Sequence, residues 1–108
     1  MTRRAILWCA LLLGGAMASG GAWAADAQVT VDNFTFSPPT LTVPAGTKVI
    51  WVNHDDIPHK IVGRDDPVGL NSPVLDTDES FSTTFAKPGT YAYFCSLHPH
   101  MQGQVVVR

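Results

Sequence analysis

Hydrophobic and polar residues alternate along most of the chain after residue 24, which is the pattern of half-buried β-strands. Two short segments alternate regularly, at 28–32 (QVTVD) and 40–43 (TLTV). A longer segment, 47–53 (TKVIWVN), is apolar on both faces through its centre, as expected of a strand in the middle of a sandwich. Four further strands are expected at residues 59–62, 80–86, 90–95 and 103–107. The pattern therefore predicts an all-β protein.

Turn residues separate the predicted strands and indicate the architecture. Pro44-Ala45-Gly46 and Lys87-Pro88-Gly89 each interrupt the alternation. No stretch after residue 24 combines helical periodicity with a capping signal. Several short strands joined by turns are typical of an antiparallel sandwich or barrel. The sequence has no internal repeat or low-complexity segment, so we predict a single domain over residues 25–108.

The first 24 residues have a different character. Two arginines precede an apolar run at 5–13, and Ala22-Trp23-Ala24 forms an A-x-A cleavage signature. The apolar run is too short to span a membrane. We therefore predict a signal peptide over residues 1–24, followed by an exported mature chain that does not insert into a membrane.

Removal of residues 1–24 changes both the charge and the cysteine content. Five basic residues then remain against nine acidic ones, a net charge of −4. An acidic chain without clusters of Lys or Arg is not expected to bind nucleic acid or an anionic membrane surface. Cys9 leaves with the signal peptide, so Cys95 is the single thiol of an 84-residue domain and no internal disulfide can form. A domain of this size usually benefits from a disulfide or a metal ion.

The heptapeptide CSLHPHM near the end of the chain gathers several metal-binding side chains. Cys95 ends a predicted strand, and His98 and Met101 lie in the predicted loop before the last strand. A second loop delivers His59 from another part of the sheet. If the two loops meet at one end of the sandwich, these four side chains can converge. One thiolate, two imidazoles and a distant thioether form the ligand set of a blue-copper electron-transfer site.

The same residues have other interpretations. Cys95 could be a buried structural thiol, His59 a strand-edge residue and Met101 a gap-filler in the core. Zinc is disfavoured because methionine is not among its usual ligands. A Cys–His nucleophile would need an orienting third group and a pocket, for which a domain of 84 residues leaves little room. The combined spacing favours copper, and His54 and His100 are expected to be solvent-facing loop residues.

The chain resembles the cupredoxins, and most closely the amicyanins, at the residues of this predicted site. CSLHPHM followed by QGQVVV has the short Cys-x2-His-x2-Met spacing, whereas plastocyanins and pseudoazurins have a longer spacer before the methionine. The resemblance also covers VDNFTFSP at 31–38, WVNHDDIPHK at 51–60 and KPGTYAYFC at 87–95. These segments extend over essentially the whole mature chain.

The resemblance implies a Greek-key β-sandwich with one type 1 copper ion that transfers single electrons in the periplasm. Carried over residue by residue, the copper ligands are His59, Cys95, His98 and Met101. Asn53 matches the family asparagine that ties the two ligand loops together, and we expect its amide to reach Ser96. The chain departs from the amicyanins at Ser96-Leu97, where they have Thr-Pro, and at His100, where they have an aromatic residue. These departures leave the redox partner open.

The predicted function is that of a periplasmic electron carrier and not of an enzyme. The expected electron port is His98, within an apolar collar that suits transient docking and is formed by Pro58, Leu97, Pro99 and Met101. Transient redox proteins are the expected partners; the resemblance to amicyanins suggests a c-type cytochrome or a periplasmic dehydrogenase, but kinship of fold does not identify the partner. The chain is expected to be a monomer. A basic partner could be steered, or the surface merely kept soluble, by Asp65, Asp66, Asp76, Asp78 and Glu79. The alternative function is copper storage or delivery, which would use the same ligands.

Overall fold

Eight β-strands make up the regular structure of the protein. The computed structural model describes residues 26–65 and 69–108, and the predicted signal peptide lies outside this part of the chain. Its strands are β1 (Ala27–Asp32), β2 (Thr35–Ser37), β3 (Thr40–Val43), β4 (Thr47–Asn53), β5 (Ile61–Gly63), β6 (Ser80–Phe85), β7 (Gly89–Cys95) and β8 (His98–Val107). Among the described residues, no helix has the length and hydrophobicity needed to span a membrane.

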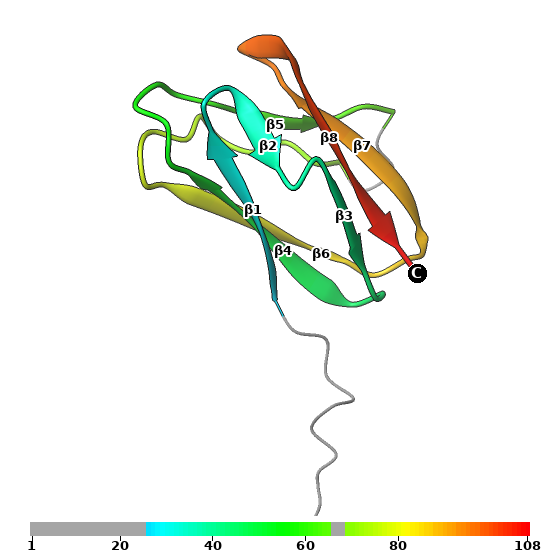
Figure 1. Cartoon of the computed structure of the whole chain (residues 1–108). Coiled ribbons are helices and arrows are strands. Elements are labelled where there is room, and N and C mark those ends of the chain that lie inside the picture. Colours follow the sequence, from blue (N-terminus) through cyan, green and yellow to red (C-terminus); the bar gives the residue numbers. More distant parts are fainter. Residues whose placement is uncertain (1–25, 66–68) are drawn as a thin grey trace, which may run out of the picture.

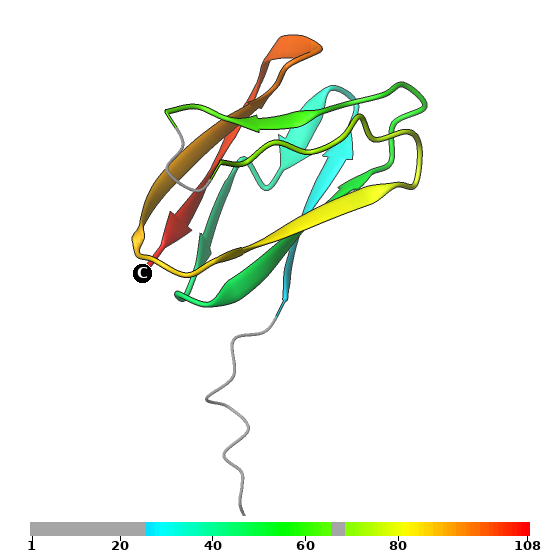
Figure 2. The same ribbon diagram turned by 180° about the vertical axis from the view of Figure 1, so that it is seen from behind.

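The strands form two four-stranded sheets that pack face to face. One sheet has the order β2-β1-β4-β6 and the other β3-β8-β7-β5, and Figures 1 and 2 show the two layers from opposite sides. From β2 to β7 every connection passes from one sheet to the other. The predicted all-β sandwich is therefore confirmed.

Two of the strand pairs differ from the antiparallel arrangement that was expected. β1 pairs with β4, and β3 with β8, in parallel, while the pairs β1–β2, β4–β6, β5–β7 and β7–β8 are antiparallel. Alternation of hydrophobic and polar residues shows which face of a strand is buried. It carries no information on the direction of the neighbouring strand, which depends on how the connections cross between the sheets.

Inward-facing side chains of β4 and β7 fill the centre of the sandwich. Trp51 of β4 and Cys95 of β7 are completely buried, and Tyr93 of β7 has 1% of its surface exposed. The ring of Trp51 lies edge-on to that of Tyr93, with centroids 5.3 Å apart. Gly103 on β8 makes room for this packing, because a Cβ at that position would lie 2.6 Å from Cζ and from the hydroxyl oxygen of Tyr93. Large aromatic side chains thus provide much of the buried apolar surface of a small core.

The strand bounds agree best with the sequence pattern where one face of a strand is buried. β3 and β4 begin and end at the predicted residues. β2 was not predicted, and β5 begins two residues after the predicted start. β8 begins at His98 and not at Gly103, so that residues 98–101 belong to a strand and not to a loop. The reason is the very short turn before His98, which allows pairing with β7 to begin at once.

Candidate metal centre

Cys95 and His98 face each other across the hairpin of β7 and β8. The two residues are paired in the strand register, and Ser96 and Leu97 form the turn between them. A two-residue turn leaves little freedom of relative movement, so the thiol and the imidazole are held on one rigid element. Cys95 is fully buried, whereas His98 is half-buried and reaches the surface.

His59 reaches the same place from the connection between β4 and β5, which crosses from one sheet to the other. Its backbone exchanges two hydrogen bonds with that of Leu75, at 3.0 and 2.7 Å. The imidazole is completely buried. This part of the chain is therefore anchored by its backbone and by the packing around the ring.

His59, Cys95 and His98 bring three donor atoms together. Sγ of Cys95 lies 3.6 Å from Nδ1 of His59 and 3.8 Å from Nδ1 of His98, and all three atoms lie within 4.8 Å of one another. A metal ion with a sulfur ligand at about 2.3 Å, a nitrogen ligand at about 2.0 Å and an angle of about 120° between them sets these two donors about 3.7 Å apart. The observed spacing therefore fits one metal ion bound by a thiolate and two imidazoles.

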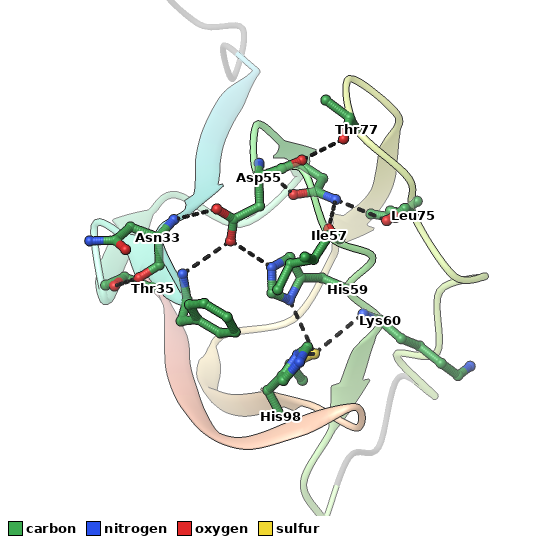
Figure 3. A network of polar contacts seen from close by, with 12 residues as sticks. Asn33, Thr35, Asp55, Ile57, His59, Lys60, Leu75, Thr77 and His98 are labelled. Atoms are coloured by element: carbon green, nitrogen blue, oxygen red, sulfur yellow. Dashed lines mark hydrogen bonds and ion pairs between the residues drawn. The ribbon is translucent and has the colours of Figure 1, made fainter.

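Asp55 holds the ring of His59 at the nitrogen that faces away from the sulfur. Its Oδ2 lies 2.7 Å from Nε2 of His59, and Figure 3 shows the ring between the carboxylate and the sulfur. Because a carboxylate accepts the proton on Nε2, Nδ1 is left with its lone pair directed at the metal position. Asp55 thereby selects the tautomer that can bind a metal through Nδ1.

The same carboxylate accepts two backbone hydrogen bonds. The N–H of Asn33 donates to Oδ1 at 2.8 Å and that of Phe34 to Oδ2 at 3.0 Å. Burial acts to raise the pKa of Asp55, but the hydrogen bonds from Phe34, His59 and Asn33 outweigh burial, and the pKa is lowered from its ordinary value. Asp55 is therefore ionised at neutral pH and available as an acceptor for all three donors.

Two hydrogen bonds made by the backbone of Lys60 tie the His59 segment to the hairpin of β7 and β8. The N–H of Lys60 donates to Sγ of Cys95 at 3.4 Å, and the carbonyl of Lys60 accepts from the N–H of Ser96 at 3.1 Å. An N–H directed at the sulfur stabilises negative charge on a thiolate, which is one of the ways a protein sets the potential of a metal–thiolate site.

Asn53 does not make the contact that was expected of it. Its amide group donates to the carbonyls of Ile57 and Leu75, each at 2.9 Å, and its Oδ1 accepts from the N–H of Asp55 at 2.9 Å. The prediction that Asn53 reaches Ser96 is therefore wrong. The side chain is completely buried at the end of β4. Its hydrogen bonds all go to the loop before His59 and to Leu75, which pairs with His59.

Met101 is buried at the start of β8, with 4% of its surface exposed. It lies where the register of the hairpin shifts, because Cys95 is opposite His98 while Phe94 is opposite Gln102. Residues 99–101 therefore bulge from the ladder. Met101 faces the interior and does not belong to the exposed collar that was predicted around His98.

The two other histidines of the described chain are exposed, as expected. Nδ1 of His54 lies 3.7 Å from the carboxylate of Asp78 in an exposed pair, and His100 follows Pro99 on the surface. The charged residues Asp65, Asp76, Asp78 and Glu79 are also exposed, and Asp66 lies outside the described residues.

Two residues near the donor atoms were not found from the sequence. Asp55 stands in a polar loop, where a carboxylate is ordinarily a turn residue. Phe34 stands in the segment VDNFTFSP, which carries part of the resemblance but gives no sign of a contact with the metal centre. Its ring is edge-on to that of His98 with centroids 5.1 Å apart, and 53% of its surface is exposed. Both roles depend on contacts between distant segments and have no local signature.

Comparisons with known proteins agree with this geometry. The family model of the cupredoxin-like domain matches residues 4–107. Amicyanin-alpha from Methylorubrum extorquens is 34% identical over 101 residues, which cover 91% of this chain and 85% of that protein. A purple cupredoxin from Nitrosopumilus maritimus has a TM-score of 0.70 and 36% identity over 76% of this chain and 99% of its own. A copper-containing nitrite reductase from Thermus scotoductus has a TM-score of 0.72 and 35% identity over 76% of this chain, but over 22% of its own.

Proposed function

This chain belongs to the cupredoxin-like domain family, and from that premise we propose that it is a blue-copper protein that carries single electrons in the periplasm. We propose that one copper ion is held by His59, Cys95, His98 and Met101. The observation that carries this proposal is the convergence of one sulfur and two Nδ1 atoms, 3.6 and 3.8 Å from the sulfur. The soft sulfur donors favour Cu(I), while imidazole accommodates both oxidation states.

When bound, copper supplies a one-electron couple between Cu(II) and Cu(I). The chain would supply the frame that holds the ion in both states. The hairpin fixes Cys95 relative to His98, and Asp55 fixes the ring of His59. Since Cys95 and His59 are completely buried, water is kept from the donor atoms on that side. A fixed frame of this kind reduces the rearrangement that accompanies each electron transfer.

His98 is the proposed route by which electrons enter and leave. It is half-buried, and the ring of Phe34, which is 53% exposed, lies against it. Its chain neighbours Leu97, which is 46% exposed, and Pro99 are also on the surface, as is Pro58 beside His59. A small apolar surface suits a short-lived complex with a redox protein. We propose a c-type cytochrome or a periplasmic dehydrogenase as the class of partner, and a monomeric state for the free protein.

A copper store or a copper carrier would use the same donor atoms, and electron transfer is favoured over these functions by the rigidity of the frame. We also propose that the chain is not itself an enzyme. Its likeness to nitrite reductase covers 22% of that longer chain. Residues 26–65 and 69–108 contain one group of three or more closely spaced His, Cys, Asp or Glu donors.

The proposal is tested by adding Cu(II) to the purified apoprotein and recording the absorption and electron paramagnetic resonance spectra. We expect an intense blue charge-transfer band, which Cys95→Ser abolishes while the apoprotein remains folded. His100→Ala, which changes an exposed histidine in the same segment, is the matched control and should keep the band. A wild-type protein without the band, or a blue Cys95→Ser variant, would refute the assignment.

The same preparation separates electron transfer from storage. A carrier of electrons should be reduced and reoxidised repeatedly without losing copper to a chelator. A storage or delivery protein should release the ion when it is reduced in the presence of the chelator.

A further inference from the structure

Phe34 combines two features that are unfavourable when taken separately. Its φ is +58°, directly after Asn33 at +52°, and residues other than Gly, Asn and Asp seldom occupy this left-handed region. Its large apolar side chain is 53% exposed. Backbone conformations of this kind persist only where the surrounding structure holds them, and they concentrate at functional sites.

Asp55 is what holds the backbone at this turn. Its two carboxylate oxygens accept the N–H groups of Asn33 and Phe34, at 2.8 and 3.0 Å. The oxygen that accepts from Phe34 is also the one that lies 2.7 Å from Nε2 of His59. A single carboxylate therefore fixes the turn between β1 and β2 and the His59 ring together, as the contacts of Asp55 in Figure 3 show.

The ring of Phe34 is placed against both imidazoles. It is edge-on to His98 at a centroid distance of 5.1 Å and to His59 at 6.0 Å, each with an interplanar angle of 88°. His59 is already held at Nε2 by Asp55. Within residues 26–65 and 69–108, by contrast, the one hydrogen-bond contact of the His98 ring is at Nδ1, with Cys95. The rings of His59 and Phe34 each lie 5.1 Å from that of His98, and of these two neighbours Phe34 is the exposed one.

We propose that Phe34 is a positioning residue that holds the His98 imidazole in the metal-binding orientation. Asp55 fixes the left-handed turn, and the turn places the ring so that rotation of His98 away from Cys95 is obstructed. This inference rests on the proposed function, because His98 is taken as a ligand of the copper ion.

Phe34→Asn is the informative variant. Asparagine tolerates the left-handed conformation, so the turn and its two N–H bonds to Asp55 are kept while the aromatic ring is removed. Val74→Asn is the matched control, since Val74 is another apolar residue with 49% exposure and lies in the segment before β6. Phe34→Tyr retains the ring and should behave as the wild type does.

The readouts are the release of Cu(II) to an excess of chelator, the spectrum of the Cu(II) protein, and the urea midpoint of the apoprotein. Phe34→Asn should release Cu(II) about tenfold faster or more, as for other losses of groups that orient metal ligands, and its charge-transfer band should shift. The urea midpoint of the apoprotein should be unchanged or higher, because the strained phenylalanine backbone is relieved. A general loss of stability could not produce faster release of Cu(II) together with an unchanged or higher urea midpoint.

Each outcome decides between the two proposals. If the wild type is blue and Phe34→Asn has the same release rate and spectrum, the positioning role is overturned and the proposed function stands. If the wild type binds Cu(II) without a blue band, the proposed function fails and this inference fails with it. Should Phe34→Asn not fold, Phe34→Tyr is compared with Phe34→Leu, and equal release rates for these two would overturn the inference.

Discussion

Replacement of Asp55 by asparagine tests the network that connects the β1–β2 turn to the candidate metal centre. The substitution preserves the size of the side chain and removes its charge. In the wild type, Oδ1 accepts from Asn33 and Oδ2 from both Phe34 and His59. In Asp55→Asn one of these positions becomes an NH2 group, which cannot accept. The orientation that keeps most bonds places the remaining oxygen at the Oδ2 position and leaves the N–H of Asn33 facing an NH2 group.

The size of the effect follows from this count. One hydrogen bond to a charged acceptor is lost outright, which costs roughly 1.5 to 3 kcal/mol. The other two bonds change from charge-assisted to neutral, and neutral bonds are roughly half as strong. We therefore expect Asp55→Asn to lower the free energy of unfolding of the apoprotein by about 3 kcal/mol. For a domain of this size that corresponds to a decrease in Tm on the order of 12 to 24 °C.

The assay is urea unfolding of the reduced apoprotein at a series of pH values. Because the pKa of Asp55 is lowered in the folded state, its contribution is present above the ordinary carboxyl pKa and is lost as the pH falls through the folded value. The difference between wild type and Asp55→Asn should thus be constant near neutral pH and should shrink below about pH 4. A difference that is absent at pH 7, or that does not change in acid, would refute the role given to the carboxylate.

Three further variants test other parts of the structure. Met101→Gln should keep the blue colour and lower the reduction potential, because a harder oxygen ligand favours Cu(II); an unchanged potential in voltammetry would show that Met101 is not a ligand of the copper ion. Gly103→Ala should destabilise the apoprotein by about 1 to 3 kcal/mol in urea unfolding, since its Cβ would lie 2.6 Å from Cζ of Tyr93, and a neutral result would contradict the close packing. Tyr93→Phe should be neutral or slightly stabilising at pH 7, because the buried hydroxyl makes no well-formed hydrogen bond among the described residues and only the nearby Trp51 indole offsets its burial. Burial raises the pKa of Tyr93 from 10.0 to about 12. The stability that the protonated Tyr93 hydroxyl contributes is therefore present below pH 10 and is lost as the pH rises towards the pKa of the folded state. That alkaline loss should be absent from Tyr93→Phe.

The strands could be predicted wherever burial gives a segment a clear pattern of hydrophobic and polar residues. Thr40–Val43 begins and ends where the alternation does, and Thr47–Asn53 coincides with the longer segment that is apolar on both faces through its centre. β2 was missed because it is three residues long and follows a turn made by Asn33 and Phe34, both with positive φ and neither a glycine. The pairing of β1 with β4 in parallel could not be inferred, since alternation is the same in either direction.

The convergence of His59, Cys95 and His98 could be predicted because their chemistry is unusual, whereas the surroundings of these donor atoms could not. A thiolate, two imidazoles and a thioether at short spacing form a pattern that few other sites require. Asp55 lacks such a pattern, because its partners Asn33 and Phe34 are 22 and 21 residues away in the chain. Asn53, unlike Asp55, was singled out from the sequence, but its hydrogen-bond partners Ile57 and Leu75 became known only from the fold.

His59 lies on a connection that passes from one sheet to the other, whereas Cys95 and His98 lie together on a hairpin of the second sheet. An ion bound to all three would act as a cross-link between positions 36 residues apart, in a part of the chain, residues 26–65 and 69–108, whose single thiol is the free Cys95. Closing a loop of this length with a covalent bond stabilises a protein by about 4 kcal/mol in the chain-entropy model. Copper content and resistance to unfolding would therefore change together. A molecule that lost its ion would unfold more often and would be cleaved more readily by proteases.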